Sequence, residues 1–190
     1  MGFLKRTFFL APRPLWRGRW FRTLAILPLL CRAAGAQGAP EYAVKGVFMY
    51  KFGDYVEWPA GAFTGPGTPF TIGILGEDPF DGGLDQSVQN RTVQGRPIVV
   101  KRFRKAEQVH GVQVLYLSDS ETDRWEQDLA ILKGLSILTI GDRSGRPGAV
   151  ITFVIQDNKV RFTIDAAAAD RAGLKLSSKL LSLAASVRKG

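Results

Sequence analysis

Apolar residues recur at helical spacing in the first hydrophobic segment beyond residue 40. These residues are Val44, Phe48, Phe52, Tyr55 and Val56. The spacing predicts a helix with an apolar face, and Lys45, Lys51 and Asp54 are expected on its polar side. Pro59 moves the preceding Trp58 out of the α region, so the helix is expected to end before it.

Short apolar runs then alternate with helical patterns. The runs cover residues 70–76, 98–100, 112–117 and 135–140. Helices are predicted over residues 78–89, where Asp78-Pro79 is a start signal, and over residues 121–133. Strands that alternate with helices favour a layered α/β domain with a mostly parallel sheet and right-handed crossovers.

The C-terminal part shows apolar residues at every second position instead. Residues 151–155 and 160–164 each place apolar side chains on one face, and Asp157-Asn158 separates them. Both turn residues tolerate a positive φ, so an antiparallel hairpin is predicted.

Two further helices are expected after the hairpin. Asp165 is a candidate N-cap for a helix over residues 166–172, which Gly173 ends. A terminal helix begins near Ser177 or Ser178, with an apolar stripe formed by Leu180, Leu183, Ala184 and Val187. The expected fold is a single layered α/β domain, with a mostly parallel sheet flanked by helices, a C-terminal antiparallel hairpin and a terminal helix.

The distribution of charge indicates an exported protein. The formal net charge is +9, but seven of the 26 basic residues and none of the 17 acidic ones precede Gln37. Residues 1–36 read as a signal peptide: a basic segment, a short apolar core and Ala34-Gly35-Ala36 before the cleavage point. A domain over residues 37–190 then carries 19 basic and 17 acidic residues, a net charge of +2. We therefore expect a periplasmic protein that does not bind nucleic acid.

The sequence offers little material for catalysis. Cys31 is the only cysteine and lies in the leader, and His110 is the only histidine. Neither a transition-metal site nor a cofactor is expected, and no nucleophile elbow accompanies His110. The acidic cluster Asp78, Asp81 and Asp85 lacks the spacing of a calcium loop and fits the start of a helix. Gly73 and Gly76 match neither of the glycine-rich phosphate motifs.

Two aromatic residues lie in the expected loop after the first helix. Trp58 and Phe63 are candidates for binding an apolar or aromatic small molecule, because loop aromatics often line binding sites.

Four segments resemble the YfiR-like family of periplasmic proteins, in the order and spacing of that family. They are residues 42–59 with the motif VEWP, residues 70–80, residues 92–98 (TVQGRPI) and residues 171–181 (RAGLKLSSKLL). The resemblance implies a dimeric α/β domain that represses an inner-membrane diguanylate cyclase by binding its periplasmic domain, and so limits biofilm formation. The disulfide-based redox sensing linked to the family cannot carry over, because no cysteine follows Gln37.

We therefore predict a non-enzymatic homodimer that binds the cyclase or a similar membrane receptor. The expected contact residues are Glu57, Trp58, Arg161, Arg171, Leu174 and Lys179. They combine apolar surface with basic groups, which suits a partner that has an apolar centre and an acidic rim. Two alternatives remain: a small-ligand receptor that uses Trp58 and Phe63, and a periplasmic hydrolase that depends on His110 or Asp78.

Overall fold

The computed structural model describes residues 38–142 and 147–189. The predicted signal peptide and its cleavage point lie outside these residues. Within the described part, an eight-stranded sheet has the order β10-β8-β7-β6-β5-β2-β4-β3. Its pairings are parallel except β3–β4 and β7–β8. The predicted class, a mostly parallel α/β sheet with an antiparallel hairpin near the C-terminus, is confirmed.

The central strands are short and almost wholly buried, as expected for a parallel sheet covered on both faces. They are β2 (Phe70–Leu75), β5 (Val114–Leu117) and β6 (Leu138–Asp142). Alternate residues of β2 and β5 enter two separate cores. Ile72 and Tyr116 belong to the core beneath α1 (Gly38–Gly53), whereas Leu75 and Leu117 pack with Trp125 of α3 (Trp125–Ile131).

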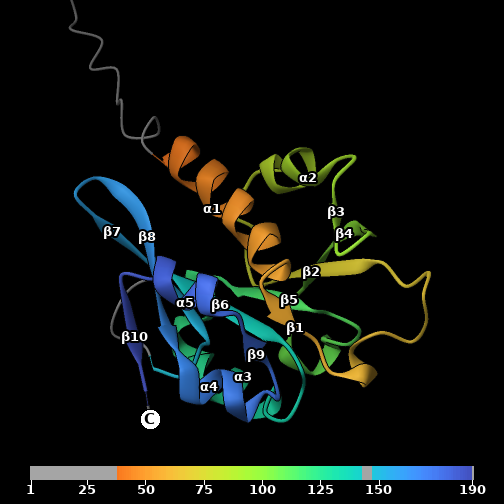
Figure 1. Cartoon of the computed structure of the whole chain (residues 1–190). Coiled ribbons are helices and arrows are strands. Elements are labelled where there is room, and N and C mark those ends of the chain that lie inside the picture. Colours follow the sequence, from red (N-terminus) through yellow and green to blue (C-terminus); the bar gives the residue numbers. More distant parts are fainter. Residues whose placement is uncertain (1–37, 143–146, 190) are drawn as a thin grey trace, which may run out of the picture. The chain divides into compact units, whose positions relative to one another are not determined.

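Helix α1 lies along one face of the sheet, with α2 (Gly83–Val88) beside it (Figure 1). Gly46 of α1 faces α2, and a Cβ at its position would lie 3.4 Å from Leu84 Cδ1, an ordinary van der Waals distance. On its other side α1 packs on the hairpin of β7 (Ile151–Gln156) and β8 (Lys159–Asp165), where Phe52 meets Phe162 at a ring-centroid distance of 4.8 Å. Phe48 also packs on Phe162, so the hairpin holds the C-terminal half of α1.

The prediction for the first helix was wrong about where the helix ends and which of its faces is buried. It ends at Gly53, and Val56 begins β1 (Val56–Glu57), which pairs with β9 (Lys175–Leu176). Val44 is 45% exposed, whereas the predicted polar residue Lys45 is 1% exposed. The buried face is therefore rotated toward Lys45, because it follows the packing of Phe48, Phe52 and Met49.

The second predicted helix is shorter than expected. It begins at Gly83 after a left-handed Gly82, whereas Asp78 closes a local turn by accepting a bond from the backbone N–H of Phe80. Strand β4 (Arg96–Phe103) was predicted over residues 98–100, but β3 (Thr92–Val93), with a turn at Gln94 and Gly95, was missed.

The hairpin, the Asp165 cap and the start of the last helix near Ser177 are as predicted. Asp157 and Asn158 have positive φ, Asp165 accepts from the backbone N–H of Ala168, and Ser177 accepts from that of Leu180. These caps begin α4 (Ala166–Arg171) and α5 (Ser178–Leu183).

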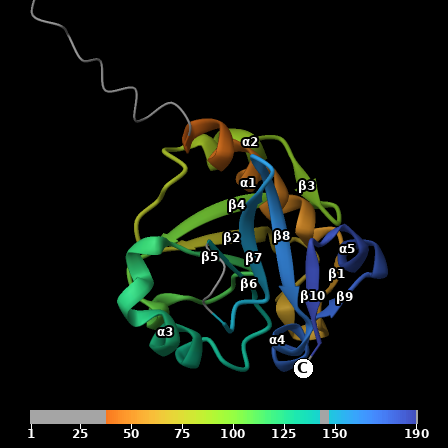
Figure 2. The ribbon, with the colours of Figure 1, turned by 90° about the vertical axis from the view of Figure 1, so that its left-hand side faces the viewer.

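The terminal helix ends earlier than its apolar stripe suggested. Val187 lies in β10 (Ser186–Arg188), a strand parallel to β8, and Leu183 is 52% exposed (Figure 2). The predicted apolar stripe is therefore divided between a short helix and an edge strand. Pairing with β8 provides the backbone hydrogen bonds that a last helical turn would otherwise make.

Candidate functional site

A lysine is buried in the core at the N-terminal half of α1. The Nζ of Lys45 lies 2.5 Å from Oδ2 of Asp142, and it also donates to Glu41, one helical turn earlier. The ring of Tyr42 lies 4.4 Å from the same Nζ. A buried ammonium is costly unless it is paired and hydrogen-bonded, and here two carboxylates satisfy it.

The sheet positions the carboxylate that faces Lys45. Asp142 is the last residue of β6, and its Oδ2 also accepts from the hydroxyl of Tyr116 on β5, at 3.0 Å. The ring of Tyr116 is held in turn by Phe80, at a centroid distance of 5.2 Å. The polar cluster therefore consists of Glu41, Tyr42, Lys45, Tyr116 and Asp142, and its members come from one helix and two parallel strands.

The cluster favours a charged lysine and neutral tyrosines. Burial opposes the charge on Lys45, but the hydrogen bonds to Asp142 and Glu41 outweigh it and raise the lysine pKa above its ordinary value. Burial, followed by the negative charge of Asp142, raises the pKa of Tyr116 far above that of a free tyrosine. The same two causes raise the pKa of Tyr42. Tyr116 therefore acts as a hydrogen-bond donor at any physiological pH.

A cleft of about 480 Å³ opens beside the polar cluster. Its described lining is Glu41, Tyr42, Lys45, Asp119, Asp142, Phe153, Val154 and Ile155. Asp119 follows β5 and Asp142 ends β6, so the cleft lies at the carboxyl ends of two neighbouring parallel strands. That edge is where open α/β sheets usually bind ligands.

Three of the predicted contact residues are brought close together by the β1–β9 pair. Glu57 is paired in register with Lys175, and their charged groups lie 3.9 Å apart. Trp58 follows Glu57 directly, and Lys179 of α5 holds its Nζ 5.4 Å from the ring of Tyr55. Glu57 and Lys179 are exposed and Trp58 is half-buried, so this surface is accessible to a partner.

The other predicted contact residues are placed differently. Arg171 is exposed at the end of α4, beside α3, and lines a second groove of about 310 Å³. Arg161 is exposed on β8, opposite Val154. Leu174 is 2% exposed and packs in the core, so its side chain is not available on the surface and the interface prediction needs correction there. It is buried because β9 follows it directly and pairs with β1 beneath α1.

The two predicted ligand-binding aromatics do meet. The rings of Trp58 and Phe63 are 6.5 Å apart, and Trp58 also packs edge-on against the core residue Phe70 at 5.6 Å. Arg96 lies 4.0 Å from the Phe63 ring and donates to three carbonyls of the loop over residues 65–68. The loop is therefore held in place, and the aromatic pair forms a half-buried surface next to Glu57.

The residues considered for catalysis do not form a common site. The carboxylates are bound to an arginine, and the histidine lies in a separate loop. Asp78 and Asp85 both bind Arg102, at 2.8 and 2.5 Å, and the hydrogen bond from Arg102 lowers the pKa of Asp85. His110 is exposed in the loop before β5. The backbone N–H groups of Gly76 and Glu77 already donate to the carbonyl of Phe103 and to Oγ of Ser120, so they are not free for a phosphate.

The sequence profile of the YfiR/HmsC-like family matches residues 42–185, which is nearly the whole described domain. The chain belongs to the YfiR/HmsC-like family. The resemblance inferred from four sequence segments is therefore confirmed. The family match includes α1 from Tyr42 onward, both strands of the polar cluster and the β1–β9 pair.

Comparison with solved structures matches two proteins to the YfiR/HmsC-like domain at low sequence identity. The ABC domain of Streptococcus pneumoniae in complex with L-Trp has a TM-score of 0.50 and 10% identity, over 75% of this chain and 60% of that one. A conserved domain protein of Vibrio cholerae has a TM-score of 0.46 and 13% identity, over 62% of this chain and 54% of that one. The chain thus spans less than two thirds of either protein, and the first likeness shows a shared fold alone.

No curated protein matches the YfiR/HmsC-like chain significantly. In the described ranges, 38–142 and 147–189, none of the helices has the length and hydropathy needed to cross a bilayer. The same residues contain no group of three or more histidine, cysteine, aspartate or glutamate side chains arranged to hold a metal ion.

Sequence reasoning missed the polar cluster around Lys45. Two signals were present: Glu41 and Lys45 are four residues apart, as helical ion pairs are, and Asp142 lies two residues after the apolar run 135–140. Nothing in the spacing, however, relates Lys45 to a residue 97 positions away. The pairing depends on how α1 is rotated over the sheet.

Proposed function

We propose that this chain is a periplasmic regulatory protein that binds the periplasmic domain of an inner-membrane diguanylate cyclase and holds the enzyme inactive. The observation that carries the proposal is the family match over residues 42–185. The YfiR/HmsC-like family is regulatory, non-catalytic and periplasmic, and it is consistent with control of cyclic di-GMP signalling. The homodimeric state expected from the resemblance is part of this proposal.

Inhibition would follow from a difference in affinity. A protein that binds the inactive arrangement of a receptor more tightly than the active one shifts the population toward inactivity. Moving a receptor from 1:99 to 99:1 needs a preference of about 10⁴-fold. Contacts made only with the inactive arrangement of the receptor would have to supply that preference, because contacts made equally with both arrangements shift nothing.

The contact surface that we propose is the one around β1, β9 and α5, extended by two arginines. Glu57, Trp58 and Lys179 form its compact part, and Arg171 and Arg161 are the outlying basic groups. The basic groups favour a receptor surface with acidic residues. The disulfide switch linked to the family is excluded by the absence of cysteine after Gln37, so the signal would be a ligand or the receptor itself.

A second candidate function is reception of a small ligand, and the cleft beside Lys45 favours it. The cleft lies at the carboxyl ends of β5 and β6, and its described lining carries three carboxylates, one ammonium and an apolar wall. These groups suit a small molecule with an amino group and an apolar part. The Trp58–Phe63 pair is the other ligand surface, and quenching of tryptophan fluorescence by a metabolite panel tests it directly.

Capture from membranes tests the leading proposal. The full chain, tagged at its C-terminus and exported to the periplasm, is used to capture proteins from solubilised inner membrane. Recovery of a receptor with a periplasmic sensor and a cytoplasmic cyclase domain is expected. Recovery of a different membrane receptor retains the binding role but changes the pathway, and recovery of nothing from a well-expressed chain favours the ligand-receptor function.

A further inference from the structure

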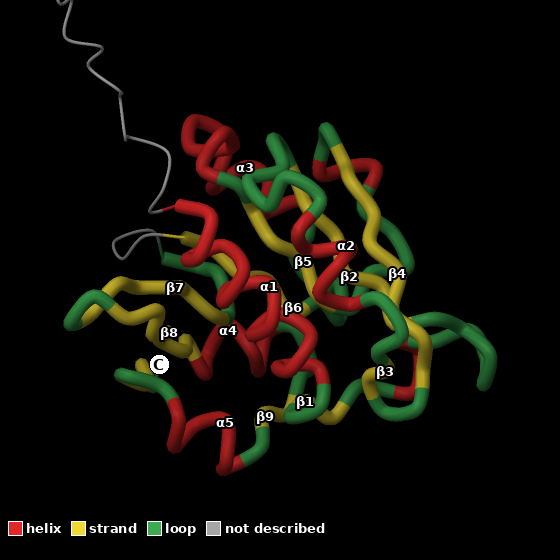
Figure 3. Tube along the Cα trace, turned by 90° about the horizontal axis from the view of Figure 1, so that it is seen from above, coloured by secondary structure: helices red, strands yellow, loops and turns green. Residues whose placement is uncertain are grey.

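The outer edge of β4 is unpaired over most of its length. β4 pairs with β2 through residues Ile98 to Phe103, but on its other side β3 covers only Arg96 and Pro97. Seen from above, β4 lies at the margin of the sheet, with α2 beside it (Figure 3). Among the described residues, no strand continues the ladder beyond β3, because Asn90, with a φ of 57°, turns the chain away toward α2.

The direction of the free backbone groups follows from one hydrogen bond. The carbonyl of Phe103 accepts from the N–H of Gly76 and therefore faces the β2 side. Successive residues of a strand direct their peptide groups to opposite sides, so the N–H and C=O groups of Val100 and Arg102 face outward, beyond the part of β4 that β3 covers. These groups have the spacing that an added strand needs.

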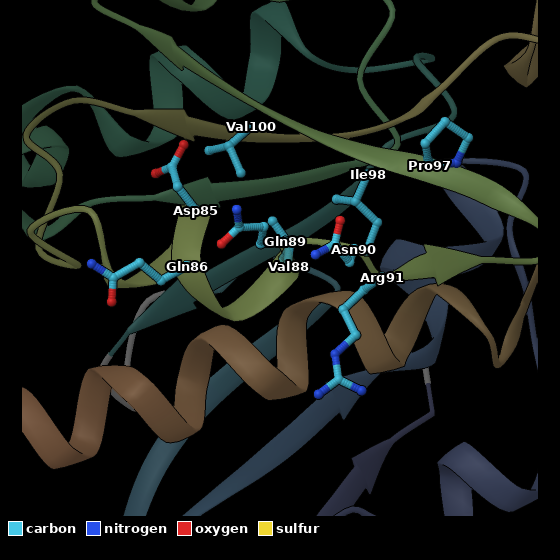
Figure 4. A pocket seen from close by; sticks show the side chains of 9 residues that line it. All are labelled: Asp85, Gln86, Val88, Gln89, Asn90, Arg91, Pro97, Ile98 and Val100. Carbon is cyan, nitrogen blue, oxygen red and sulfur yellow. The ribbon is translucent and has the colours of Figure 1, made fainter.

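A groove of about 560 Å³ runs beside this edge on the α2 face. Its apolar lining is Val88, Pro97, Ile98 and Val100, and Figure 4 shows Ile98 and Val100 projecting from β4 toward the segment that follows α2. A strand added to β4 would place every second side chain over this groove. An apolar residue at those positions would bury surface against Ile98 and Val100.

Exposed basic residues surround the outer edge of β4. Lys101, Arg104 and Lys105 are exposed, and none of them forms an ion pair with any described residue. Arg102 is already held by Asp78 and Asp85. Lysine and proline on an edge strand discourage indiscriminate pairing, and here they leave an acidic strand as the favoured partner.

We propose that the outer edge of β4 binds an extended acidic segment of a protein partner by strand addition, with alternate apolar residues over the groove. A second copy of this chain is a poorer occupant, because antiparallel pairing centred on Val100 would set Arg104 opposite Arg96 of the other copy. Residues 1–36 are also unsuitable, since they contain no aspartate or glutamate. The inference rests on the proposed binding role but concerns a surface separate from Glu57, Trp58 and Lys179.

A pair of designed peptides tests the edge. The probes are two capped ten-residue peptides, one alternating valine with glutamate and one alternating valine with lysine, added to the purified exported protein. We expect the glutamate peptide to bind at least tenfold more tightly and to slow amide exchange at Val100 and Arg102. Equal affinity of the two peptides, or unchanged exchange at these amides at millimolar peptide, would overturn the proposal.

Two variants and a control make the result specific. Val100→Pro removes an outward-facing N–H and leaves the β2 ladder intact. The triple variant Lys101→Glu/Arg104→Glu/Lys105→Glu reverses the charge of the edge. Each variant should lower the affinity for the glutamate peptide at least tenfold. Lys159→Glu, at the tip of the β7–β8 hairpin, should not. A dimer that dissociates on Val100→Pro would instead assign the edge to a second copy. Capture of a cyclase that is unaffected by the edge variants would refute this inference while leaving the proposed function standing.

Discussion

The ammonium of Lys45 lies 2.5 Å from the carboxylate of Asp142, across 97 residues of sequence. This contact ties α1 to the carboxyl end of β6 inside the apolar core. Substitution of a buried ion pair by apolar residues is often neutral, but removal of one partner leaves the other charge unpaired. The pair therefore contributes more to the position of α1 than to the net free energy of folding.

Lys45→Met is expected to lower the free energy of unfolding by about 3–5 kcal/mol, because Asp142 would remain buried without its cation. The double variant Lys45→Met/Asp142→Asn should recover much of that loss, since the amide oxygen of the introduced asparagine still accepts from the hydroxyl of Tyr116. Urea denaturation of the three proteins measures both effects. An unchanged urea midpoint for Lys45→Met would show that the pair does not hold α1 in solution.

Stability at neutral pH should be limited by a second buried carboxyl group. Asp128 of α3 is 4% exposed, and burial followed by the charge of Glu121 raises its pKa above the ordinary value of 3.8. A raised pKa means that the folded state favours the protonated form, so this contribution is complete below about pH 4 and is lost as the pH rises through the folded-state value. Oδ2 of Asp128 also lacks a hydrogen-bond partner among the described residues.

Asp128→Asn is therefore expected to raise the melting temperature by about 2–4 °C at pH 7.5 and to change it little at pH 4. Thermal unfolding followed by circular dichroism at the two pH values measures the difference. Glu126→Gln, an exposed position on the same helix, is the control and should have no effect at either pH. Destabilisation of Asp128→Asn at pH 7.5 would mean that the ionised carboxylate has a partner in the folded protein.

Gly141, the residue before Asp142, has no room for a Cβ atom. A Cβ at Gly141 would lie 3.2 Å from Cζ2 of Trp125 and closer still to the neighbouring ring atom, and the indole cannot bend aside. Gly141→Ala should cost about 1–3 kcal/mol and loosen the end of β6. Gly83→Ala, which meets no atom within 4 Å, is the matched control and should be neutral or slightly stabilising. Equal unfolding free energies for the two variants would contradict the tight packing of Trp125 on β6.

The proposed receptor surface predicts the effect of charge reversal. Arg171→Glu/Lys179→Glu should weaken capture of the membrane receptor at least tenfold, a change of about 1.4 kcal/mol. Lys51→Glu, an exposed lysine on α1, should leave capture unchanged. Titration of the receptor on immobilised protein measures the affinities. Undiminished binding by the double variant would remove this surface from the account.

The sequence predicted the elements whose signals are local. Such elements are the two-residue turn at Asp157 and Asn158, the N-cap Asp165, the helix start near Ser177 and the buried strands β2 and β5. Each depends on residues within a few positions of one another. These signals, with the alternation of strands and helices, were sufficient for the fold class.

Features that depend on contacts distant in sequence could not be predicted. The burial of Lys45 depends on the rotation of α1 over the hairpin, and Val187 joins a strand because β8 is available beside it. Leu174 follows Gly173 and precedes the charged Lys175, which is typical of an exposed turn, yet its side chain is buried in the core beside the β1–β9 pair. The open edge of β4 becomes visible when the order of the strands is known.

Cyclase turnover tests the central claim most directly. The membrane receptor captured by the exported protein is assayed for conversion of GTP to cyclic di-GMP, with increasing amounts of the purified protein added in the same detergent. The proposed function predicts that turnover falls as the receptor becomes saturated, and that it recovers when the protein is withdrawn. Turnover that stays constant or rises while the receptor is saturated would contradict the claim that this protein is a repressor.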